Sequence, residues 1–396
     1  MIRTGEIDPL ARKRRRENLH LFWRDRWFAW RDRLLADQRF QRWAAGFPLT
    51  RQIAEKRARA LFDLCAGFVY SQVLLACVEL HLFDILAERP QTTGELSRRL
   101  SLDAEATARL LNAAVALRLV ERRGGKRFGL GVLGAALLGN PAISAMIEHH
   151  ELLYSDLRNP VALLRGPKQP TALSKYWSYA RADEPDALAR NNVAEYSALM
   201  SASQALIAED VLDAWPLARH RCLLDIGGGD GTFLIAAATR APNLRLMLYD
   251  LPAVADLARE RLSASGLAQR ASVFSGNFFT QPLPSGADLI TLIRVLHDHD
   301  DTDVVALLHN IRRALPEDGL LLIAEPMTGA VGADVIGDAY FGFYLLAMGS
   351  GRARSADELA RLLRETGFDG GRPLATRRPM LTSAVIARPV HSSKWT

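Results

Sequence analysis

The sequence predicts an α/β protein in which a mostly parallel sheet is covered by helices and is preceded by a smaller helical domain. Two patterns carry this prediction. Short apolar segments alternate with helical segments from residue 221 onward, and a helix, helix, hairpin pattern of the winged-helix type lies between residues 92 and 130. The 396 residues, 49% hydrophobic and 24% charged, suffice for two or three packed domains and exclude a disordered chain.

The first 50 residues are predicted to form a basic, tryptophan-rich extension that is helical over residues 10–45 and ends at Gly46-Phe47-Pro48. Residues 1–60 hold 16 Lys/Arg and 7 Asp/Glu, a balance of +9, whereas the rest of the chain holds 34 and 37, a balance of −3. Trp23, Trp27 and Trp30 recur at helical spacing and share one face. Three functions fit such a segment: lying on an anionic membrane, packing in a dimer, or binding nucleic acid.

Residues 51–165 are predicted to form the winged-helix-like domain. Helices are expected to begin at Thr92 and at Asp103, and residues 121–130 are expected to form a hairpin. A DNA-binding regulator shares this pattern. However, the candidate recognition helix carries only Arg109 and Arg118 as basic residues and is otherwise strongly apolar, which favours a packing role.

Residues 166–396 are predicted to form the α/β domain. It begins with a proline-rich linker over residues 166–185 and a long helix over about 186–215. Helices are expected between successive strands, which makes the sheet mostly parallel. The expected strands are Cys222–Ile226, Leu244–Asp250, Ser272–Ser275, Asp288–Ile293, Leu320–Ala324 and Ser383–Arg388.

Several classes of protein are disfavoured by composition. The three cysteines lack a CxxC spacing, which disfavours a disulfide scaffold and a cysteine zinc site and suits a reducing cytoplasm. The longest uncharged apolar stretch, residues 64–78, is shorter than the ~20 residues that cross a bilayer, so no spanning helix is expected. The acidic cluster over residues 298–303 is explained by a helix N-terminus, and no metal is expected.

A glycine-rich loop joins the first strand of the α/β domain to a helix. Gly227, Gly229 and Gly231 allow positive φ and close approach of a ligand, and Asp225 precedes them in the strand. Asp250 ends the second strand, where a carboxylate can accept both hydroxyls of a ribose. The pattern predicts a site for an unphosphorylated adenosine ligand.

Four motifs in order resemble those of the S-adenosylmethionine-dependent O-methyltransferases, in the branch of the caffeic acid and hydroxyindole enzymes: 225–231, Asp250-Leu251-Pro252, His297-Asp298 and Ala324-Glu325-Pro326. Within that branch the chain is most similar to the carotenoid O-methyltransferases of purple bacteria, in its length, its Trp/Arg-rich extension and the run 294–300. The resemblance implies a class I, Rossmann-like methyltransferase domain, a homodimer formed through the N-terminal domain, and S-adenosylmethionine as cofactor, with S-adenosylhomocysteine as product.

The resemblance also implies roles for individual residues. His297 matches the general base and Glu325 the acid that orients it. Those matching the cofactor site are Asp225, Gly227, Gly229, Gly231, Asp250, Leu251, Asn277, Phe278 and Arg294. The family often has a second orienting glutamate before an Arg-Ser/Thr pair, and here that position is Ala353.

A large apolar substrate is expected, because aromatic and methionine side chains gather in two segments: Tyr196, Met200, Phe341, Phe343, Tyr344 and Met348. The predicted reaction is methylation of a hydroxyl, with a 1-hydroxycarotenoid as the expected substrate. A phenol, hydroxyindole or aromatic polyketide is the main alternative, and a relative that binds the cofactor without methylating is a remote one. The enzyme is expected to be cytoplasmic, with peripheral membrane contact through residues 10–45 and without nucleic acid.

Overall fold

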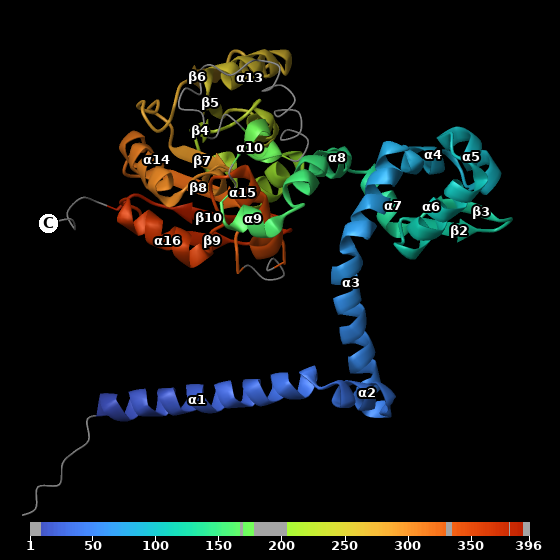
Figure 1. Cartoon of the computed structure of the whole chain (residues 1–396). Helices are drawn as coiled ribbons and strands as arrows, with labels where there is room; N and C mark the ends of the chain where they lie inside the picture. Colours follow the sequence, from blue (N-terminus) through green and yellow to red (C-terminus); the bar gives the residue numbers. More distant parts are fainter. Residues whose placement is uncertain (1–8, 167–168, 178–203, 330–334, 380, 391–396) are drawn as a thin grey trace, which may run out of the picture.

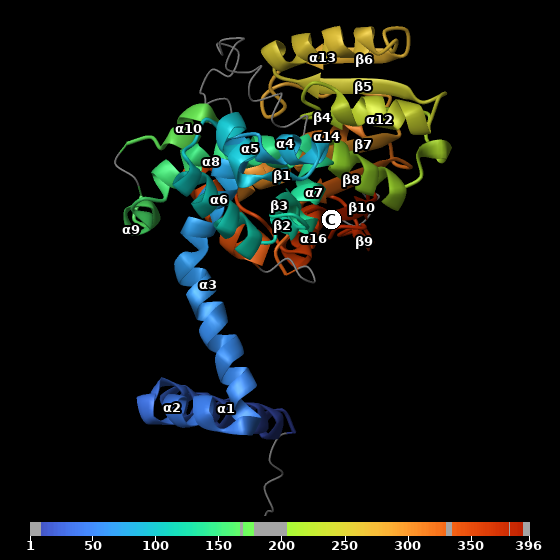
Figure 2. The ribbon, with the colours of Figure 1, turned by 90° about the vertical axis from the view of Figure 1, so that its right-hand side faces the viewer.

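The computed structural model describes residues 9–166, 169–177, 204–329, 335–379 and 381–390. The chain forms an N-terminal arm, a helical domain with a small sheet, and an α/β domain (Figure 1). The arm consists of α1 (Pro9–Ala36), α2 (Gln38–Gly46) and the first half of α3 (Pro48–Glu79). Figures 1 and 2 both show the arm standing away from the two domains.

The helix expected over residues 10–45 is divided at Asp37. One oxygen of this side chain accepts hydrogen bonds from the backbone N–H groups of Arg39 and Phe40, at 2.7 and 2.9 Å. Asp37 therefore caps a new helix, which the tryptophan spacing alone did not reveal. The expected break at residues 46–48 is confirmed: α2 ends at Gly46, and Pro48 takes the first position of α3, where its missing N–H costs nothing.

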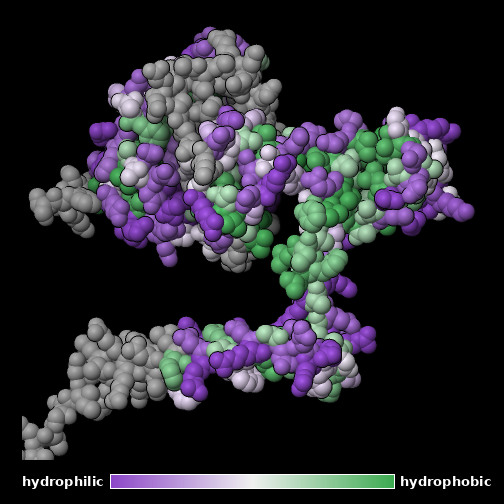
Figure 3. Space-filling model, in the orientation of Figure 1, coloured by the Kyte–Doolittle hydropathy of each residue, from purple (hydrophilic) through white to green (hydrophobic). Residues whose placement is uncertain are grey.

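Helix α3 joins the arm to the helical domain. By length and composition it could cross a membrane, since an 18-residue window has a mean hydropathy of 1.8 and only 11% of it is buried. The sequence analysis did not identify α3 as a candidate membrane span, because it considered only stretches without charged residues. The buried residues Cys77 and Val78 lie at its C-terminal end. Figure 3 shows apolar side chains exposed along α3 where it approaches the helical domain; Leu61, Phe62, Leu64 and Phe68 are among its exposed residues.

The helical domain confirms the winged-helix-like pattern. Thr92 and Glu95 form a capping box at the start of α5, and Asp103 caps α6 through the N–H of Ala106. The hairpin pairs β2 with β3, and β1 adds to the other side of β3. The elements are α4 (Leu82–Glu88), β1 (Gln91–Thr92), α5 (Thr93–Leu100), α6 (Ala104–Ala116), β2 (Val120–Arg123), β3 (Arg127–Leu130) and α7 (Val132–Leu138).

Helix α8 (Pro141–Asp156) connects the two domains and packs against α3 and α7 on one side and α10 and α15 on the other. It is followed by α9 (Pro160–Leu164) and α10 (Ala172–Tyr176), so the stretch expected as a linker contains a short helix. Residues 204–214 are helical, as expected, and the earlier part of the predicted long helix lies outside the described residues.

Over the described residues, the sheet of the α/β domain has the strand order β6-β5-β4-β7-β8-β10-β9. Strands β6, β5, β4, β7 and β8 are parallel, and β10 and β9 are antiparallel to their neighbours. The six predicted strands are confirmed within one residue at each end, whereas β9 was missed because it has only three residues. The bounds are β4 (Cys222–Ile226), β5 (Arg245–Asp250), β6 (Ala271–Ser275), β7 (Leu289–Ile293), β8 (Leu320–Glu325), β9 (Arg372–Leu374) and β10 (Ser383–Ala387).

Helices cover both faces of this sheet. Alternate residues of β4 divide between two cores: Leu224 packs with α14 and α16, and Leu223 packs with α12, α13 and residues 204–214. The helices are α12 (Thr232–Arg240), α13 (Pro252–Ala264), α14 (Asp301–Ala314), α15 (Gly342–Met348) and α16 (Ala356–Glu365), with the short helices η3 (Leu217–Arg219), η4 (Leu296–Asp298) and η5 (Val335–Phe341), the last a π-helix. The carboxyl ends of the parallel strands meet at one edge, where ligands bind in such sheets.

Candidate active site

The glycine loop lies between β4 and α12 with the conformation that the sequence predicts. Gly227, Gly229 and Gly231 all have positive φ, at 64°, 57° and 85°. A Cβ at position 227 would lie 2.8 Å from the Val295 side chain, so this glycine is also required by close packing. The loop presents backbone, not side chains, to the edge of the sheet.

Two carboxylates flank this loop, one buried (Asp225) and one half-buried (Asp250). Asp225 accepts a hydrogen bond from Thr291 Oγ1 at 2.6 Å, and its other oxygen has no partner among the described atoms. Burial raises the pKa of Asp225 to about 7, against the opposing hydrogen bond from Thr291. Asp250 accepts hydrogen bonds from the N–H groups of Gly229 and Leu251, at 2.8 and 2.7 Å, and burial raises its pKa to about 6. Asp250 is thus fixed beside the loop at the end of β5.

This edge of the sheet fits an adenosine-type cofactor such as S-adenosylmethionine. The unpartnered oxygen of Asp225 and the positive-φ loop make a polar cradle, and each oxygen of Asp250 keeps a free acceptor direction for a ribose hydroxyl. Asn277 follows β6, and its side-chain oxygen accepts from the N–H of Phe279 at 2.9 Å. Phe278 lies beside it, with its ring 5.7 Å from that of His299.

His297 and Glu325 meet as predicted. His297 lies in η4, directly after β7, and Glu325 ends β8, the neighbouring parallel strand. His297 Nδ1 is 2.5 Å from Glu325 Oε2, and both side chains are buried. The other carboxylate oxygen accepts from the N–H groups of Val295 and Leu296, at 2.9 and 2.7 Å. Glu325 therefore fixes the ring through Nδ1 and leaves Nε2 as the atom for proton transfer.

A second carboxylate, missed by the sequence analysis as a site residue, reaches the other ring nitrogen. Asp298 Oδ1 lies 3.2 Å from His297 Nε2. Burial alone would lower the pKa of His297, but Asp298 and Glu325 together raise it above its ordinary value. Burial in turn raises the pKa of Asp298, against the attraction of His297. Asp298 is part of the His297-Asp298 motif, but the sequence analysis assigned it to the acidic cluster at the N-terminus of the following helix.

Arg294 lies close to the same centre. Its backbone has φ of 60°, in the left-handed region, and its N–H bonds to the carbonyl of Ala324 at 2.8 Å. Its charge acts on His297 and Asp298 and on the phenols of Tyr340 and Tyr344. This arginine, assigned from the resemblance to the adenine side, therefore faces the base and the aromatic segment as well.

An aromatic wall stands next to the base. The Phe341 ring lies 6.0 Å from the His297 ring, nearly perpendicular to it. Tyr344 and Met348 are buried in the same cluster, and Phe343 is half-buried. The predicted pocket residues Tyr196 and Met200 lie outside the described residues.

Two histidines of α8 complete this wall. His149 Nε2 lies 2.8 Å from the Tyr344 hydroxyl, and His150 Nε2 lies 2.7 Å from the Tyr340 hydroxyl. Burial lowers the pKa of both histidines, to about 4 for His149, so both are neutral near pH 7. No signal in the sequence links these histidines to tyrosines that lie about 190 residues away.

No group of three or more His, Cys, Asp or Glu in the described part of the chain is placed to hold a metal ion. A buried histidine with one oriented nitrogen can accept a proton, next to a cradle for an adenosine and a wall suited to an apolar substrate.

Comparisons with known proteins agree with this arrangement. The sequence matches the O-methyltransferase domain over residues 155–369 and the O-methyltransferase dimerisation domain over residues 62–140. It is 44% identical over 359 residues to a demethylspheroidene O-methyltransferase from Cereibacter sphaeroides, covering 90% of this chain and 93% of that protein. A second such enzyme, from Rhodobacter capsulatus, is 40% identical over 90% of this chain and 88% of its own length.

Among solved structures, the methyltransferase of calicheamicin biosynthesis in its SAH-bound form is similar. The TM-score is 0.70 at 28% identity, over 85% of this chain and 98% of the other.

Proposed function

This chain belongs to the S-adenosylmethionine-dependent O-methyltransferases, and we propose that it methylates the hydroxyl of a 1-hydroxycarotenoid of the demethylspheroidene type. The observation that carries the substrate class is the 44% identity to a demethylspheroidene O-methyltransferase over nine-tenths of both chains. The aromatic wall supports an apolar substrate, because the half-buried Phe341 ring lies beside the His297 ring and packs on a core cluster that contains the buried Tyr344 and Met348.

S-adenosylmethionine is the methyl donor, and its sulfonium makes the methyl group electrophilic. Asp250 binds the ribose hydroxyls in our proposal, and the glycine loop with Asp225 accommodates the methionine part. Leu251 and Phe278 enclose the adenine, with Asn277 and Arg294 at its edge. These side chains would bind and orient the cofactor, which would bring its methyl carbon in line with the attacking oxygen and exclude water.

His297 is the general base. Its Nε2 accepts the hydroxyl proton as the oxygen attacks the methyl carbon, and its Nδ1–H stays bonded to Glu325. A 1-hydroxycarotenoid is a tertiary alcohol, which is far less acidic than a phenol, so the base must be held precisely. Asp298 then stabilises the protonated ring through Nε2, at 3.2 Å in the free enzyme.

The choice of acceptor is tested by labelled methyl transfer. Purified full-length enzyme is given labelled S-adenosylmethionine together with a detergent-dispersed 1-hydroxycarotenoid or a simple phenol. We expect label in the carotenoid and none in the phenol. Label only in the phenol would overturn the carotenoid assignment and favour the aromatic alternative.

The enzyme forms a homodimer through the domain that contains α3 to α7. The matching dimerisation domain begins at residue 62, within the exposed apolar stretch of α3. Pairing of two copies would remove these side chains from water, because about 25 cal/mol is gained for each Å² of apolar surface that is buried.

The arm is proposed to hold the enzyme on a membrane surface. Trp23, Trp27 and Trp30 are 61%, 54% and 59% exposed, although each carries a large apolar ring. Arg26 lies over the Trp23 ring and Arg31 over the Trp27 ring, at 5.9 and 5.7 Å from their centres. Exposed tryptophan beside arginine suits the headgroup level of an anionic bilayer, where the ring is buried and the guanidinium meets phosphate. A carotenoid dissolved in that bilayer would then be close at hand.

Changing Trp23, Trp27 and Trp30 together to alanine is expected to weaken co-sedimentation with vesicles of phosphatidylglycerol and phosphatidylcholine by at least about tenfold, since three interfacial anchors are lost. A matched variant changes Ile143, Val161 and Leu164 to alanine; these exposed apolar residues lie outside both the arm and the matched dimerisation domain, so this variant should bind as wild type. If vesicle binding is kept and the dimer dissociates instead, the arm packs against the second copy.

A further inference from the structure

The turn that carries the base, residues 295–299, is held from two sides. From the side of β8, Glu325 accepts the N–H groups of Val295 and Leu296 and the ring of His297. The family position of a second orienting glutamate is occupied here by Ala353, which has no carboxylate. The other side of the turn is instead contacted by residues 350–354, which connect α15 to α16.

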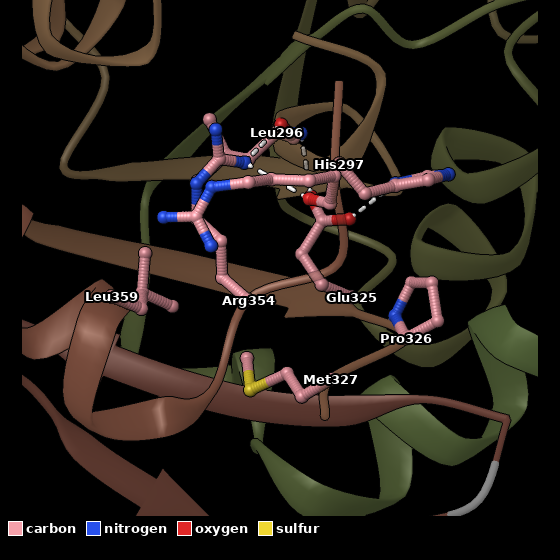
Figure 4. A pocket seen from close by; sticks show the side chains of 8 residues that line it. Leu296, His297, Glu325, Pro326, Met327, Arg354 and Leu359 are labelled. Carbon is pink, nitrogen blue, oxygen red and sulfur yellow. Dashed lines mark hydrogen bonds and ion pairs between the residues drawn. The ribbon is translucent and has the colours of Figure 1, made fainter. Parts of the chain in front are cut away.

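Arg354 is the buried charge of this second side, with a relative exposure of 5%. Its Nη1 donates to the carbonyl of Leu296 at 2.6 Å, and its Nη2 donates to the carbonyl of His299 at 2.7 Å. Figure 4 shows the Arg354 guanidinium and Glu325 on the same small cavity as His297, with the hydrogen bonds drawn. The cavity holds ≈ 10 Å³, about the space of a single water molecule.

The fork of Arg354 is itself fixed. Its Nε donates to Asp301 Oδ1 at 2.9 Å, and Arg352 donates to the other oxygen of Asp301 at 2.9 Å. Hydrogen bonds from Arg352 first, and also from Arg354, hold the pKa of Asp301 below its usual range, so this carboxylate stays charged. A guanidinium whose donors are all assigned has little freedom to move.

The backbone beside Arg354 leaves no space between the two segments. A Cβ on Gly351 would lie 2.1 Å from the carbonyl oxygen of His297, and Gly351 has φ of 78°. Ser350 Oγ donates to the carbonyl of Asp298 at 3.1 Å. The backbone carbonyls of the base turn therefore point toward residues 350–354. The N–H groups at the start of the same turn point toward Glu325.

We propose that Arg354 is a positioning residue for the base: its guanidinium binds the carbonyls of Leu296 and His299, which flank His297, and so fixes the turn through its backbone. This proposal rests on the assignment of His297 as the base. Glu325 fixes the rotation of the His297 ring, and Arg354 fixes the position of the backbone turn that carries this ring. Since a displacement of about 1 Å can cost 10²-fold in rate, the base depends on a turn that is held in place.

The test compares Arg354→Lys with Arg270→Lys in the full-length enzyme. Lysine keeps the charge but lacks the planar fork, so it cannot donate to Leu296 and His299 together. We expect kcat to fall roughly 10–100-fold in R354K, with KM for S-adenosylmethionine within about twofold. Arg270 also donates to backbone carbonyls, including that of Pro242 at 2.6 Å, but it precedes β6 at the opposite edge of the sheet, so R270K should keep wild-type kcat.

A double-mutant cycle with His297→Ala separates positioning from general destabilisation. If Arg354 acts through His297, R354K should have almost no effect in the H297A background, because the group it positions is gone. The same fold loss in both backgrounds, or a kcat for R354K equal to that of R270K, would overturn the proposal. If H297A alone keeps full activity, His297 is not the base. That result is distinguishable from a failure of the Arg354 proposal, in which H297A is impaired but R354K behaves like the control.

Should R354K fold poorly, which its melting temperature would reveal, Asp301→Asn provides the second variant. It leaves Arg354 in place but removes the charge that fixes its Nε. We expect a kcat loss of about 3–10-fold beyond that of R270K, again absent in the H297A background. Equal kcat in D301N and R270K would contradict the proposal.

Discussion

Replacing His297 with alanine is expected to lower kcat for methyl transfer by about 10²–10⁴-fold, the usual contribution of a positioned base. The alcohol can no longer pass its proton to Nε2, while the cofactor cradle at β4 and β5 is unchanged. Binding of S-adenosylmethionine, measured by calorimetry, should therefore stay within about twofold of wild type. The rate is measured as label transferred to the carotenoid under saturating donor.

The control for this variant is His309→Ala, since His309 is an exposed histidine of α14 that is remote from the sheet edge. It should keep the wild-type rate and melting temperature. Comparable activity of H297A and H309A would refute the role of His297 as base.

The pH dependence of kcat follows from the surroundings of the same histidine. Burial would lower the pKa of His297, but Asp298 and Glu325 raise it above its ordinary value. A base with a raised pKa stays protonated, and so inactive, to a higher pH. The acid limb of the wild-type profile of kcat against pH should therefore lie above pH 6.5, the ordinary pKa of a histidine. Because His297 and Asp298 interact, the apparent pKa of this limb belongs to the pair and not to His297 alone.

The central α/β domain was predictable because its signals are local. Apolar runs of five or six residues bounded by turn residues define β4, β5, β7 and β8, and a glycine loop follows the first of them. The motif acids at the strand ends then meet, because parallel neighbours bring their carboxyl ends to one edge. The pairing of His297 with Glu325 was implied by the family resemblance, and the adjacency of β7 and β8 explains it.

Other parts depend on contacts that the sequence does not encode locally. The division of the first helix rests on one side chain, Asp37, in a segment with strong helical periodicity. His149 and His150 acquire a role only because α8 passes beside Tyr344 and Tyr340. Arg354 was visible as part of an Arg-Ser pair, but its function depends on how closely residues 350–354 pass the base turn.

Changing Glu325 to glutamine is expected to lower kcat by roughly 10²–10⁴-fold although the two side chains have the same shape. The amide oxygen can still accept from Val295 and Leu296, so the turn keeps its fold. The amide nitrogen, however, donates toward His297 Nδ1. This forces the proton of the neutral ring onto Nε2, and the atom that must accept the substrate proton is then already occupied.

The E325Q variant also tests the sign of the electrostatic argument. Glu325 is one of the two carboxylates that raise the pKa of His297, so its neutralisation should lower that pKa and move the acid limb of the residual activity to lower pH. Glu317→Gln, at an exposed carboxylate paired with Arg312, is the matched control and should change neither rate nor profile. A full rate in E325Q with an unmoved limb would mean that Glu325 only supports the turn. A low rate with a shifted limb would show that Glu325 selects the tautomer of the base and raises its pKa.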